Sequence, residues 1–469
     1  LRILHNPLTG WVLYASMGVD AADFWAQYDH MYIPELGHNV SVTDYAHTLY
    51  IRASWTDFNP QEDVYGWKID SNLRAYIEGA YQRNMRLAFR VVVDSRDKRT
   101  EFTPQFVKDA GAKGFMNKGK WSPYSDDPVF QKYYTKFVKA LAKDFNDPSK
   151  VEFIDGFGLG KWGEYHTMIY STGDDTPKKA VFNWVTDIYS QAFDKVPVVI
   201  NYHRWIGAGK DWVDDEHFAA DSEEMLEEAI KKGYSLRHDA FGMTTYYGSW
   251  ERRFAKKYRN ICPIIMEGGW IVKSHNYWQD PRGYRKDSHE DVRRGEFDDS
   301  KEAHVNMMDF RFGDTKSWFK DAFDLVRRFL REGGYRLYPS EISLPLEVSK
   351  KTTPTIKHCW NNLGWGYCPT NIPQWNQKYK VAFALLDSET NEVRYTFVDT
   401  DTDLSKWIKG SPAEYVFEPD MSKVETGTYV WAVGLVDRSN KDLVGLDIAA
   451  KGDILDSGWL KLSKVSIKK

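Results

Sequence analysis

An alternation of two kinds of segment constrains the fold of this chain more than any other feature. From residue 47 to about residue 335, short apolar runs of β type are followed by longer amphipathic segments. Residues 86–93 are almost continuously apolar, as expected for a strand that is buried on both faces. Residues 127–145 carry apolar side chains at helical spacing, with Asp127 as the predicted N-cap and Pro128 at the first helical position.

This strand-and-helix unit recurs along the chain. The predicted strands cover residues 11–15, 47–53, 86–93, 151–159, 196–202, 240–246, 262–266 and 304–310. The predicted helices cover residues 69–84, 127–145, 178–193, 222–232 and 317–332. Eight strands in alternation with helices predict an α/β fold, a closed (β/α)8 TIM barrel.

The pattern changes after Pro339. Apolar and polar residues alternate over residues 380–387, 392–398, 428–437 and 459–465, with turn residues between these runs and no long helix. Short alternating strands of this kind predict a small antiparallel β-sandwich. We expect a barrel domain over residues 1–340 and a β-sandwich domain over residues 341–469.

Charge, hydropathy and composition bear on the partners of the chain. The 469 residues carry a net charge of −4 at pH 7, so no nucleic acid is expected as a partner. No run approaches 18 apolar residues, so no membrane span is expected. Aromatic residues make up 15% of the chain and include 19 Trp. This excess modestly favours an oligo- or polysaccharide partner, because the C–H face of a sugar stacks on an indole ring.

The three cysteines are Cys262, Cys359 and Cys368. Their number and spacing match neither a disulfide scaffold nor a zinc site, and we expect no cofactor. Cys359 and Cys368 either pair in an oxidising compartment or remain free thiols. The chain begins with Leu1 rather than Met, from which we expect that an N-terminal segment has been removed.

Two glutamates follow predicted strands at the places where barrel enzymes carry their catalytic groups. Glu164 comes after the fourth strand, in a glycine-rich segment between Trp162 and His166, and Glu267 ends the seventh strand. Retaining cleavage of a glycosidic bond needs two carboxyl groups about 5–5.5 Å apart, one to attack the anomeric carbon and one to protonate the departing oxygen. Either glutamate alone is more often an ordinary loop carboxylate. The two together predict a glycosidase site.

Other polar residues at predicted strand ends are candidate substrate-binding residues. Arg52 either holds Glu267 as a carboxylate or forms an ion pair inside the barrel. Asp94 and Arg96 bind either sugar hydroxyls or each other. Asn201 and His203 end the fifth strand.

Histidines and tryptophans near the same strand ends have two interpretations each. His166, His203 and His238 suggest a metal site, but no spacing typical of metal ligands supports it, and a hydrogen-bonding role is favoured. Three tryptophans are either stacking platforms for sugar rings or core residues: Trp55, Trp162 and Trp270. The long loop from residue 270 to about residue 298 is expected to form one wall of the cleft.

Several motifs in the chain resemble those of clan A retaining glycoside hydrolases, the β-galactosidase-like families. The resemblance is greatest to bacterial members whose barrel is followed by a small β-sandwich. The residues that carry it are Asn6-Pro7-Leu8-Thr9-Gly10-Trp11, Arg52-Ala53-Ser54-Trp55, Tyr65-Gly66-Trp67, Gly160-Lys161-Trp162-Gly163-Glu164-Tyr165-His166 and Trp360-Asn361-Asn362-Leu363-Gly364. The resemblance implies a β-glycosidase that acts in polysaccharide degradation and is secreted, periplasmic or at the cell surface.

The resemblance also implies roles for individual residues. Glu164 becomes the acid/base and Glu267 the nucleophile, and Tyr246 or Tyr247 is expected to donate a hydrogen bond to Glu267. Many members of the clan place Asn directly before the acid/base, where this chain has Gly163, so the contact with the sugar 2-hydroxyl is expected from Asn201 or is made differently.

The two glutamates need different protonation states at one pH. We expect Arg52 and Tyr246 to favour the charged form of Glu267 and to leave Glu164, beside Trp162, with the raised pKa. The main alternative function is a non-catalytic carbohydrate-binding protein on a glycosidase-like barrel. A metal-dependent deacetylase or peptidase and a phosphate-binding barrel enzyme lack their motifs in this chain.

Overall fold

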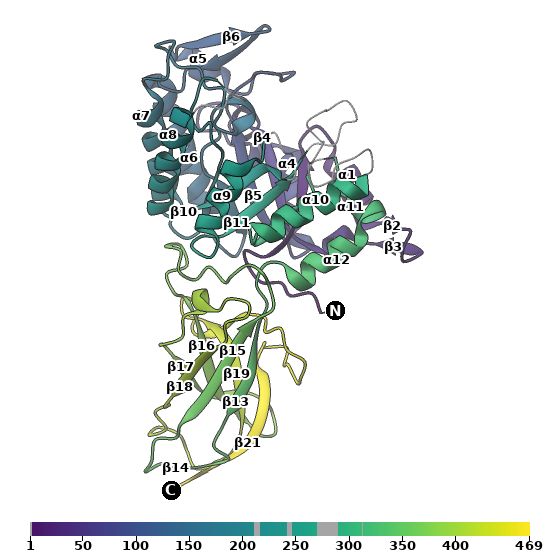
Figure 1. Ribbon diagram of the computed structural model, residues 1–469, viewed down its shortest axis with the longest axis vertical. Helices are drawn as coiled ribbons and strands as arrows, with labels where there is room; N and C mark the ends of the chain where they lie inside the picture. The colour runs from purple at the N-terminus through teal and green to yellow at the C-terminus, as the bar shows by residue number, and fades with distance from the viewer. Residues whose placement is uncertain (1, 211–215, 242–245, 270–288, 312) are drawn as a thin grey trace. The chain divides into compact units, whose positions relative to one another are not determined.

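The computed structural model describes residues 2–210, 216–241, 246–269, 289–311 and 313–469 (Figure 1). The chain divides into two compact units. One unit is Gly10–Arg328, and the other joins Leu1–Thr9 to Phe329–Lys469. The domain bounds expected from the sequence, residues 1–340 and 341–469, stay a prediction.

In the described part of the first unit, eight strands close a barrel in which every neighbouring pair is parallel. They are β1 (Gly10–Ser16), β4 (Ala46–Ser54), β5 (Arg86–Val92), β8 (Val151–Asp155), β9 (Val198–Asn201), β10 (Tyr234–Phe241), β11 (Ile264–Gly268) and β12 (Met307–Asp309). β12 pairs with β1 and closes the ring. The predicted (β/α)8 barrel is confirmed.

Helices follow the barrel strands along the chain. They are α1 (Ala21–Asp29), α2 (Trp55–Phe58), α3 (Gly66–Ile69), α4 (Ser71–Gln82), α5 (Gln105–Asp109), α6 (Pro128–Phe145), α7 (Lys178–Ala192), α8 (Glu216–Lys231), α9 (Ser249–Tyr258), α10 (His289–Glu302), α11 (Thr315–Asp321) and α12 (Phe323–Glu332). Short 3-10 helices are η1 (Val42–Asp44) and η2 (Lys161–Gly163). Two hairpins, β2 (Met31–Ile33) with β3 (His38–Val40) and β6 (Gly114–Asn117) with β7 (Lys120–Pro123), lie outside the barrel.

Capping chemistry sets the start of α6 as the sequence predicts. The Asp127 carboxylate accepts a hydrogen bond from the backbone N–H of Phe130 at 2.8 Å, and Pro128 occupies the first turn, where its missing N–H costs nothing. One face of this helix is buried and includes Phe130, Tyr134 and Phe137. These rings surround Trp55, which is fully buried.

Several predicted elements differ from the structure. β10 spans Tyr234–Phe241 and so begins before the predicted start at residue 240, because its charged residues hide its strand character, and residues 242–245 of the predicted strand lie outside the described residues. α8 begins at Glu216, before the predicted start at Ser222. The single helix predicted over residues 317–332 is two helices, α11 and α12, and the chain leaves the helical region at Ala322, whose φ is −146°.

The second unit contains two sheets that pack face to face. One has the order β13 (Leu337–Ser343), β15 (Ile356–Asn362), β18 (Ala413–Phe417). The other has the order β14 (Glu347–Ser349), β21 (Leu460–Lys468), β19 (Gly427–Asp437), β16 (Tyr379–Asp387), β17 (Val393–Asp399), and β20 (Leu443–Leu446) pairs with β19. All pairs are antiparallel except β14 with β21. The predicted β-sandwich is confirmed.

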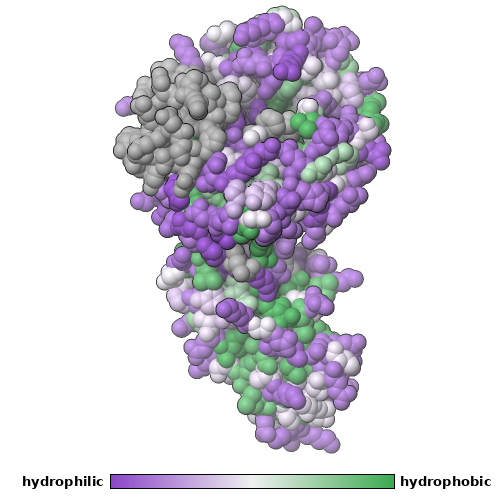
Figure 2. Space-filling model, turned by 90° about the vertical axis from the view of Figure 1, so that its right-hand side faces the viewer, coloured by the Kyte–Doolittle hydropathy of each residue, from purple (hydrophilic) through white to green (hydrophobic). Residues whose placement is uncertain are grey.

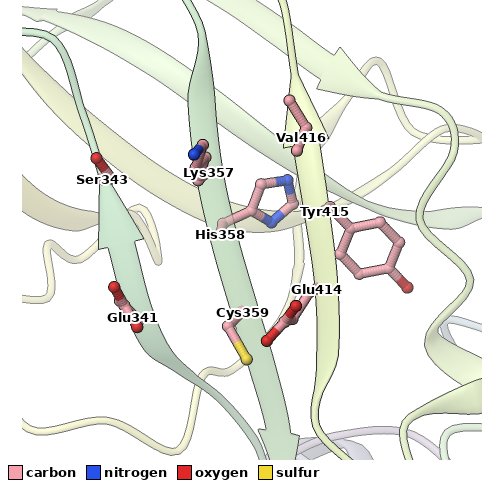
Figure 3. Close-up of a pocket in the computed structure, with 8 residues that line it drawn as sticks. All are labelled: Glu341, Ser343, Lys357, His358, Cys359, Glu414, Tyr415 and Val416. Carbon is pink, nitrogen blue, oxygen red and sulfur yellow. The ribbon is translucent and has the colours of Figure 1, made fainter.

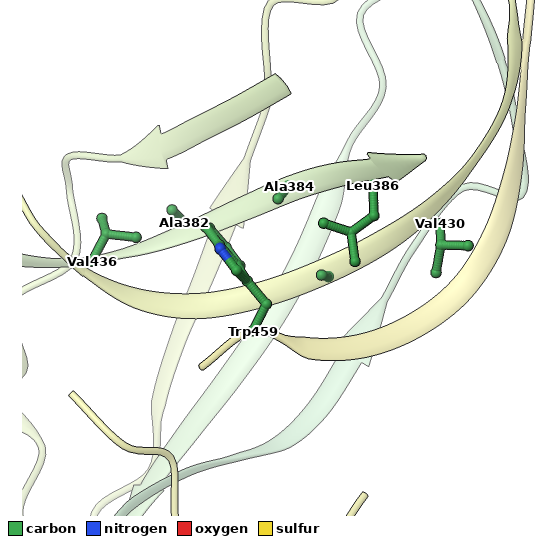
Figure 4. Packing of buried hydrophobic residues seen from close by; sticks show 7 residues of the cluster. Ala382, Ala384, Leu386, Val430, Val436 and Trp459 are labelled. Carbon is green, nitrogen blue, oxygen red and sulfur yellow. The ribbon is translucent and has the colours of Figure 1, made fainter. Parts of the chain in front are cut away.

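The larger sheet of this unit is buried on both faces. On one face, the Phe383 ring lies 5.2 Å from the ring of His358 and 6.1 Å from that of Phe417, both on the smaller sheet. The other face carries an apolar cluster drawn in Figure 4. Its members are Ala382, Ala384, Leu386, Val430, Ala432, Val436 and Trp459. Burial on both faces explains why residues 379–387 are almost continuously apolar.

The first residues of the chain are fixed to the second unit by hydrogen bonds. Asn6 donates to the carbonyl of Asp447 at 3.0 Å and accepts from the Asp447 backbone N–H at 2.7 Å. Tyr335 donates to the carbonyl of Pro7 at 2.5 Å. The three cysteines are free thiols, so Cys359 and Cys368 do not pair.

Surface hydropathy differs between the two units. On the face drawn in Figure 2, hydrophobic residues gather on the second unit, while the described surface of the barrel unit is largely hydrophilic. Exposed apolar side chains of the second unit include Leu346, Val416 and Leu443. No helix in the described residues has the length and apolar character needed to cross a membrane.

Candidate active site

Of the two predicted catalytic glutamates, one lies in a barrel strand and the other in a loop. Glu267 lies within β11, where it pairs in register with Asp309 of β12, and its side chain is 4% exposed. Glu164 comes after β8 has ended at Asp155 and directly follows η2. The predicted strand to residue 159 is therefore too long. Glu164 is delivered by a tight loop in which Gly163, Trp162 and Tyr165 have positive φ.

Two fully buried arginines connect the glutamates. Arg90 Nη1 lies 3.6 Å from Glu164 Oε1, and Arg90 Nη2 lies 3.6 Å from Glu267 Oε2. Arg237 Nη1 lies 2.9 Å from Glu267 Oε2. Since both carboxyl groups contact the same guanidinium, they are close neighbours on one side of the barrel interior.

A third carboxylate, Asp239 at the end of β10, lies between the glutamates. Its Oδ1 accepts hydrogen bonds from Arg90 and from Arg237, each at 2.6 Å, and its Oδ2 accepts one from Asn201 Nδ2 at 2.8 Å. Its negative charge acts on both Glu164 and Glu267.

The protonation states of these three groups diverge. The pKa of Asp239 is held well below its usual value because the Arg90 and Arg237 charges outweigh the effect of its burial. Burial and the Asp239 charge raise the pKa of Glu164, which His166 and Arg90 oppose. Burial, together with the Asp239 charge, also raises the pKa of Glu267 well above the usual value, against the opposing effects of Arg237 and Arg90. The expectation that only the pKa of Glu164 is raised is therefore wrong, because the Asp239 charge raises the pKa of both Glu164 and Glu267.

Two histidines hold Glu164 in place. His203 Nδ1 accepts the backbone N–H of Trp205 at 3.1 Å, so its proton is on Nε2, which lies 2.7 Å from the carbonyl oxygen of Glu164. His166 Nε2 lies 3.1 Å from Glu164 Oε2, and its Nδ1 lies 2.9 Å from Thr167 Oγ1. These contacts fix the main chain and the carboxyl group separately. Among the described residues no three His, Cys, Asp or Glu side chains form a potential metal site.

A cavity of about 580 Å³ opens onto Glu267. Tyr14 and Arg52 line it beside the glutamate. Arg52 donates to Tyr14 Oη at 3.4 Å and forms no ion pair with Glu267 in the described structure. The cations that pair with Glu267, the role predicted for Arg52, are Arg237 and Arg90. Burial, followed by the Glu267 charge, raises the pKa of Tyr14 to about 12, so this hydroxyl keeps its proton beside the glutamate.

Further predicted substrate-binding residues have other partners. Trp55 is a core residue and no stacking platform. Arg96 and Asp94 bind each other through two nitrogens, the second of the two alternatives. The Tyr247 hydroxyl contacts Tyr202 Oη at 2.9 Å and makes no hydrogen bond to Glu267. The predicted role of Trp270 lies outside the described residues, as does most of the loop from residue 270 to residue 298.

Three further predicted residues are partly exposed or keep an unused polar atom. Trp162 is partly exposed, with its ring 5.6 Å from the His166 ring. Asn201 uses its amide nitrogen on Asp239, and its buried Oδ1 has no hydrogen-bond partner among the described residues. Tyr246 is half-buried beyond the end of β10.

The residues missed from the sequence are the charged ones inside strands. They are Arg90, Asp155, Arg237, Asp239 and Asp309, together with Tyr50, whose hydroxyl donates to Asp155. Burial raises the pKa of Asp309 to about 7. A charged residue in the middle of an apolar strand is a signal that could have found them, because burying a charge is costly without a partner.

A second cavity, of about 660 Å³, lies on the smaller sheet of the second unit (Figure 3). Glu341, Cys359 and Glu414 stand opposite one another on its three strands. The aromatic ring at this cavity, Tyr415, stacks on the buried His358, with the ring centroids 5.2 Å apart. This face therefore lacks the row of exposed aromatic rings on which a sugar chain stacks.

Comparisons with known proteins find likeness in structure only. No protein-family model and no curated protein matches the chain. Similar solved structures include an endo-glycoceramidase II from Rhodococcus sp., at 13% identity and a TM-score of 0.40 over 89% of this chain and 100% of that one. A GH30 endoxylanase from Clostridium papyrosolvens is similar at 8% identity and a TM-score of 0.41, over 90% and 96%. An exo-β-1,4-mannosidase from an Opitutaceae bacterium has 11% identity and a TM-score of 0.38, over 73% and 62%.

These TM-scores lie below 0.5 and the identities below 25%, so the matches carry no argument about this chain. The function is inferred below from the chain's own residues.

Proposed function

We propose that this protein is a glycoside hydrolase that cleaves a β-glycosidic bond with retention, using Glu164 and Glu267. The observation that carries the proposal is the contact of both carboxyl groups with one buried guanidinium, that of Arg90, at 3.6 Å each. Retention requires two carboxyl groups that are close enough to reach the two sides of one glycosidic bond. Strands four and seven of the barrel supply them at the end where barrel enzymes bind substrate.

Glu164 suits the role of acid/base. Burial and the Asp239 charge raise its pKa, which favours the protonated form that a general acid donates to the departing oxygen. His203 fixes its main chain and His166 its carboxyl group. After the sugar is transferred to the enzyme, the Glu164 carboxylate removes a proton from the water that attacks the intermediate.

Glu267 suits the role of nucleophile. Its carboxylate form is stabilised by Arg237 at 2.9 Å and Arg90 at 3.6 Å. Burial and the Asp239 charge act against that form and raise its pKa, so the ionised carboxylate is a stronger base and nucleophile than a solvated one. We assign Asp239 as a positioning residue, since it pairs with both arginines and its charge raises the pKa of both glutamates.

Substrate-binding roles follow from the remaining free groups. Trp162 offers a partly exposed ring for stacking against a sugar, and Asn201 offers a buried acceptor oxygen for a sugar hydroxyl. An oligo- or polysaccharide is the proposed substrate. A secreted, periplasmic or cell-surface location goes with that substrate, and cell fractionation tests it.

The proposed function is tested with nitrophenyl β-glycosides of common sugars. NMR of the first-formed product is expected to show the β-anomer, the result of retention. Glu164→Ala is expected to keep activity on nitrophenyl glycosides, because that leaving group needs no proton, and azide is expected to speed its second step. Wild-type protein that binds these sugars but cleaves none of them would favour the alternative, a carbohydrate-binding protein. Release of the α-anomer would contradict retention.

A further inference from the structure

The cavity that opens onto Glu267 is lined by an excess of cations. Arg52, Lys98, Arg99 and Arg311 line it, against the acidic side chains Asp57, Asp97 and Glu267. We propose that this cavity binds an anionic substituent of the substrate, a carboxylate or a sulfate ester on the sugar at or next to the bond that is cleaved. This proposal rests on the proposed function and adds to it the chemical class of the substrate.

Three of these cations have no ion-pair partner among the described residues. Arg52 has a hydrogen bond to Tyr14 alone, and the Lys98 ammonium lies 5.3 Å from the centroid of the Phe102 ring. Arg99 is exposed at the cavity. Cations elsewhere in the barrel unit contrast with these. Lys178 pairs with Asp221 at 2.7 Å and Arg96 pairs with Asp94 at 2.6 Å.

The acidic residues of the cavity form hydrogen bonds or ion pairs with other groups of the protein. Asp57 caps α2 by accepting the backbone N–H of Ser54. Asp97 pairs with Lys161 at 3.0 Å and with Lys118 at 3.8 Å. Glu267 pairs with Arg237 and Arg90. No acidic side chain of the described residues pairs with Arg52, Lys98 or Arg99, and the proposed anionic group would pair with them.

The positive charge of the Lys98 ammonium is only partly neutralised by its described neighbours. Burial and the neighbouring Arg52 charge lower its pKa to about 8, against the opposing charges of Glu164 and Asp97. The charges of Glu164 and Asp97 do not offset the effects of burial and Arg52 on this ammonium. A bound anion would compensate Arg52 and Lys98 together, which is the arrangement that carboxylate- and sulfate-binding sites use.

The position of the cations defines where the anion lies on the substrate. The Glu164 charge acts to raise the pKa of both Lys98 and Arg52, and Glu267 lines the same cavity. A sugar whose anomeric carbon is beside Glu267 would thus place its own substituents, or those of the next residue, among these cations. A volume of about 580 Å³ is within the range of small-ligand sites.

The test compares matched neutral and anionic substrates. The substrates are 4-nitrophenyl β-glucoside, β-glucuronide and 6-sulfo-β-glucoside, with the galactose series alongside. The variants are Lys98→Gln and Arg99→Gln, and the control is Arg74→Gln, an exposed cation on α4. The wild type is expected to have a kcat/KM about tenfold higher or more for an anionic member, since one hydrogen bond to a charged group contributes about 1.5–3 kcal/mol.

Each outcome decides the proposal. Loss of that preference in Lys98→Gln and Arg99→Gln, with the neutral glycoside changed less than about twofold, supports it, and the preferred anion identifies carboxylate or sulfate. A preference for the neutral member, or equal losses on all three substrates, overturns the anion site and leaves the glycosidase function standing.

A second measurement separates the two proposals if no glycoside is cleaved. In that case the proposed function fails, and calorimetry with glucuronate, glucose 6-sulfate and glucose tests the anion site by itself. Binding of an anionic probe that weakens with salt and in Lys98→Gln would support the site. Absence of binding, or equal binding of glucose, would overturn it.

Discussion

The buried cluster around Glu267 in the barrel and the buried cluster around Trp459 in the second unit contain different kinds of side chain. At the catalytic end of the barrel two fully buried arginines lie among Asp155, Asp239 and Glu267. The cluster around Trp459 in the second unit consists of Ala, Leu, Val and Trp side chains alone (Figure 4). The barrel unit therefore buries a charged cluster in addition to its apolar core, whereas the cluster around Trp459 is apolar throughout.

The difference indicates what each region is for. Replacing a buried ion pair with well-packed apolar residues is often neutral or stabilising, so a buried charge cluster is a poor way to gain stability alone. Apolar burial stabilises without needing a matching partner. We infer that the barrel retains its buried charges for their effect on the pKa values of Glu164 and Glu267. In the described core of the second unit, the buried ion pair between His358 and Asp399 belongs to no charged cluster of comparable size.

The largest expected effect separates activity from stability within the barrel. Glu267→Gln removes the nucleophile and is expected to lower kcat/KM by about a thousandfold or more, about 4 kcal/mol. Gln resembles the protonated carboxyl group that a raised pKa favours, so the change in the free energy of unfolding is expected to be much smaller than the loss of activity. Enzyme assays and urea unfolding measure the two effects.

The pH dependence of that variant sharpens the test. Because the folded-state pKa of Glu267 is raised, the folded protein binds the proton more tightly than the unfolded chain does. The contribution of Glu267 to stability is then full below pH 4.5 and is lost as the pH rises toward the folded-state value. The wild type is expected to lose stability relative to Glu267→Gln as the pH rises. The opposite trend would show that Glu267 is mainly an ionised structural partner of Arg237.

The next effect concerns the charges that hold the barrel interior. Arg237→Met leaves Asp239 and Glu267 without their closest guanidinium, so we expect the barrel to lose about 3–5 kcal/mol at pH 7. The loss is expected to be smaller at lower pH, where the carboxyl groups gain protons. Urea unfolding at several pH values measures it, and a loss below about 1 kcal/mol would mean that the cluster carries little net charge.

The matching change in the second unit is Leu386→Ala. It removes a fully buried side chain from the apolar cluster and is expected to cost about 2–5 kcal/mol. No ionisable group belongs to this cluster, so the loss is expected to be the same from pH 5 to pH 8. A loss that varies with pH as strongly as in Arg237→Met would remove the contrast between the two cores.

The smallest expected effect is a shift in the pH–activity profile of Asp239→Asn. Removing the negative charge lowers the pKa of both Glu164 and Glu267, because Asp239 raises each of them. Both limbs of the bell-shaped profile are expected to move to lower pH. Glu78→Gln, an exposed carboxylate on α4, is the control and is expected to leave the profile unchanged. An unchanged profile in Asp239→Asn would contradict its assignment as a positioning residue.

The sequence predicts most of the architecture because barrel strands leave a local signal. Asp127 and Pro128 mark the start of α6 through capping chemistry that needs no tertiary information. Residues 86–92 form β5 as their apolar character indicates. β10 was misplaced because Arg237 and Asp239 interrupt its apolar pattern, and their cost is offset by partners from β5 and β11, far away in sequence.

The sequence points to Glu164 and Glu267 as candidate site residues, but it does not reveal which charged residues surround them. Glu164 and Glu267 follow from the rule that barrel strands deliver catalytic groups at their ends. Which arginine contacts Glu267 depends on where side chains meet inside the barrel, and Arg237 and Arg90 do so in place of Arg52. The effect of Asp239 on both pKa values could not be inferred, because it depends on three strands meeting at one point.

The central claim, that Glu267 attacks the sugar and Glu164 does not, is tested most directly by trapping the intermediate. A 2-deoxy-2-fluoro β-glycoside of a sugar that the enzyme cleaves slows release of the bound sugar, and mass spectrometry of peptides then locates the attachment. We predict a single covalent sugar on the peptide that contains Glu267, at the Glu267 side chain, and none on Glu267→Gln. Attachment to Glu164 or to Asp239 would contradict the proposed roles.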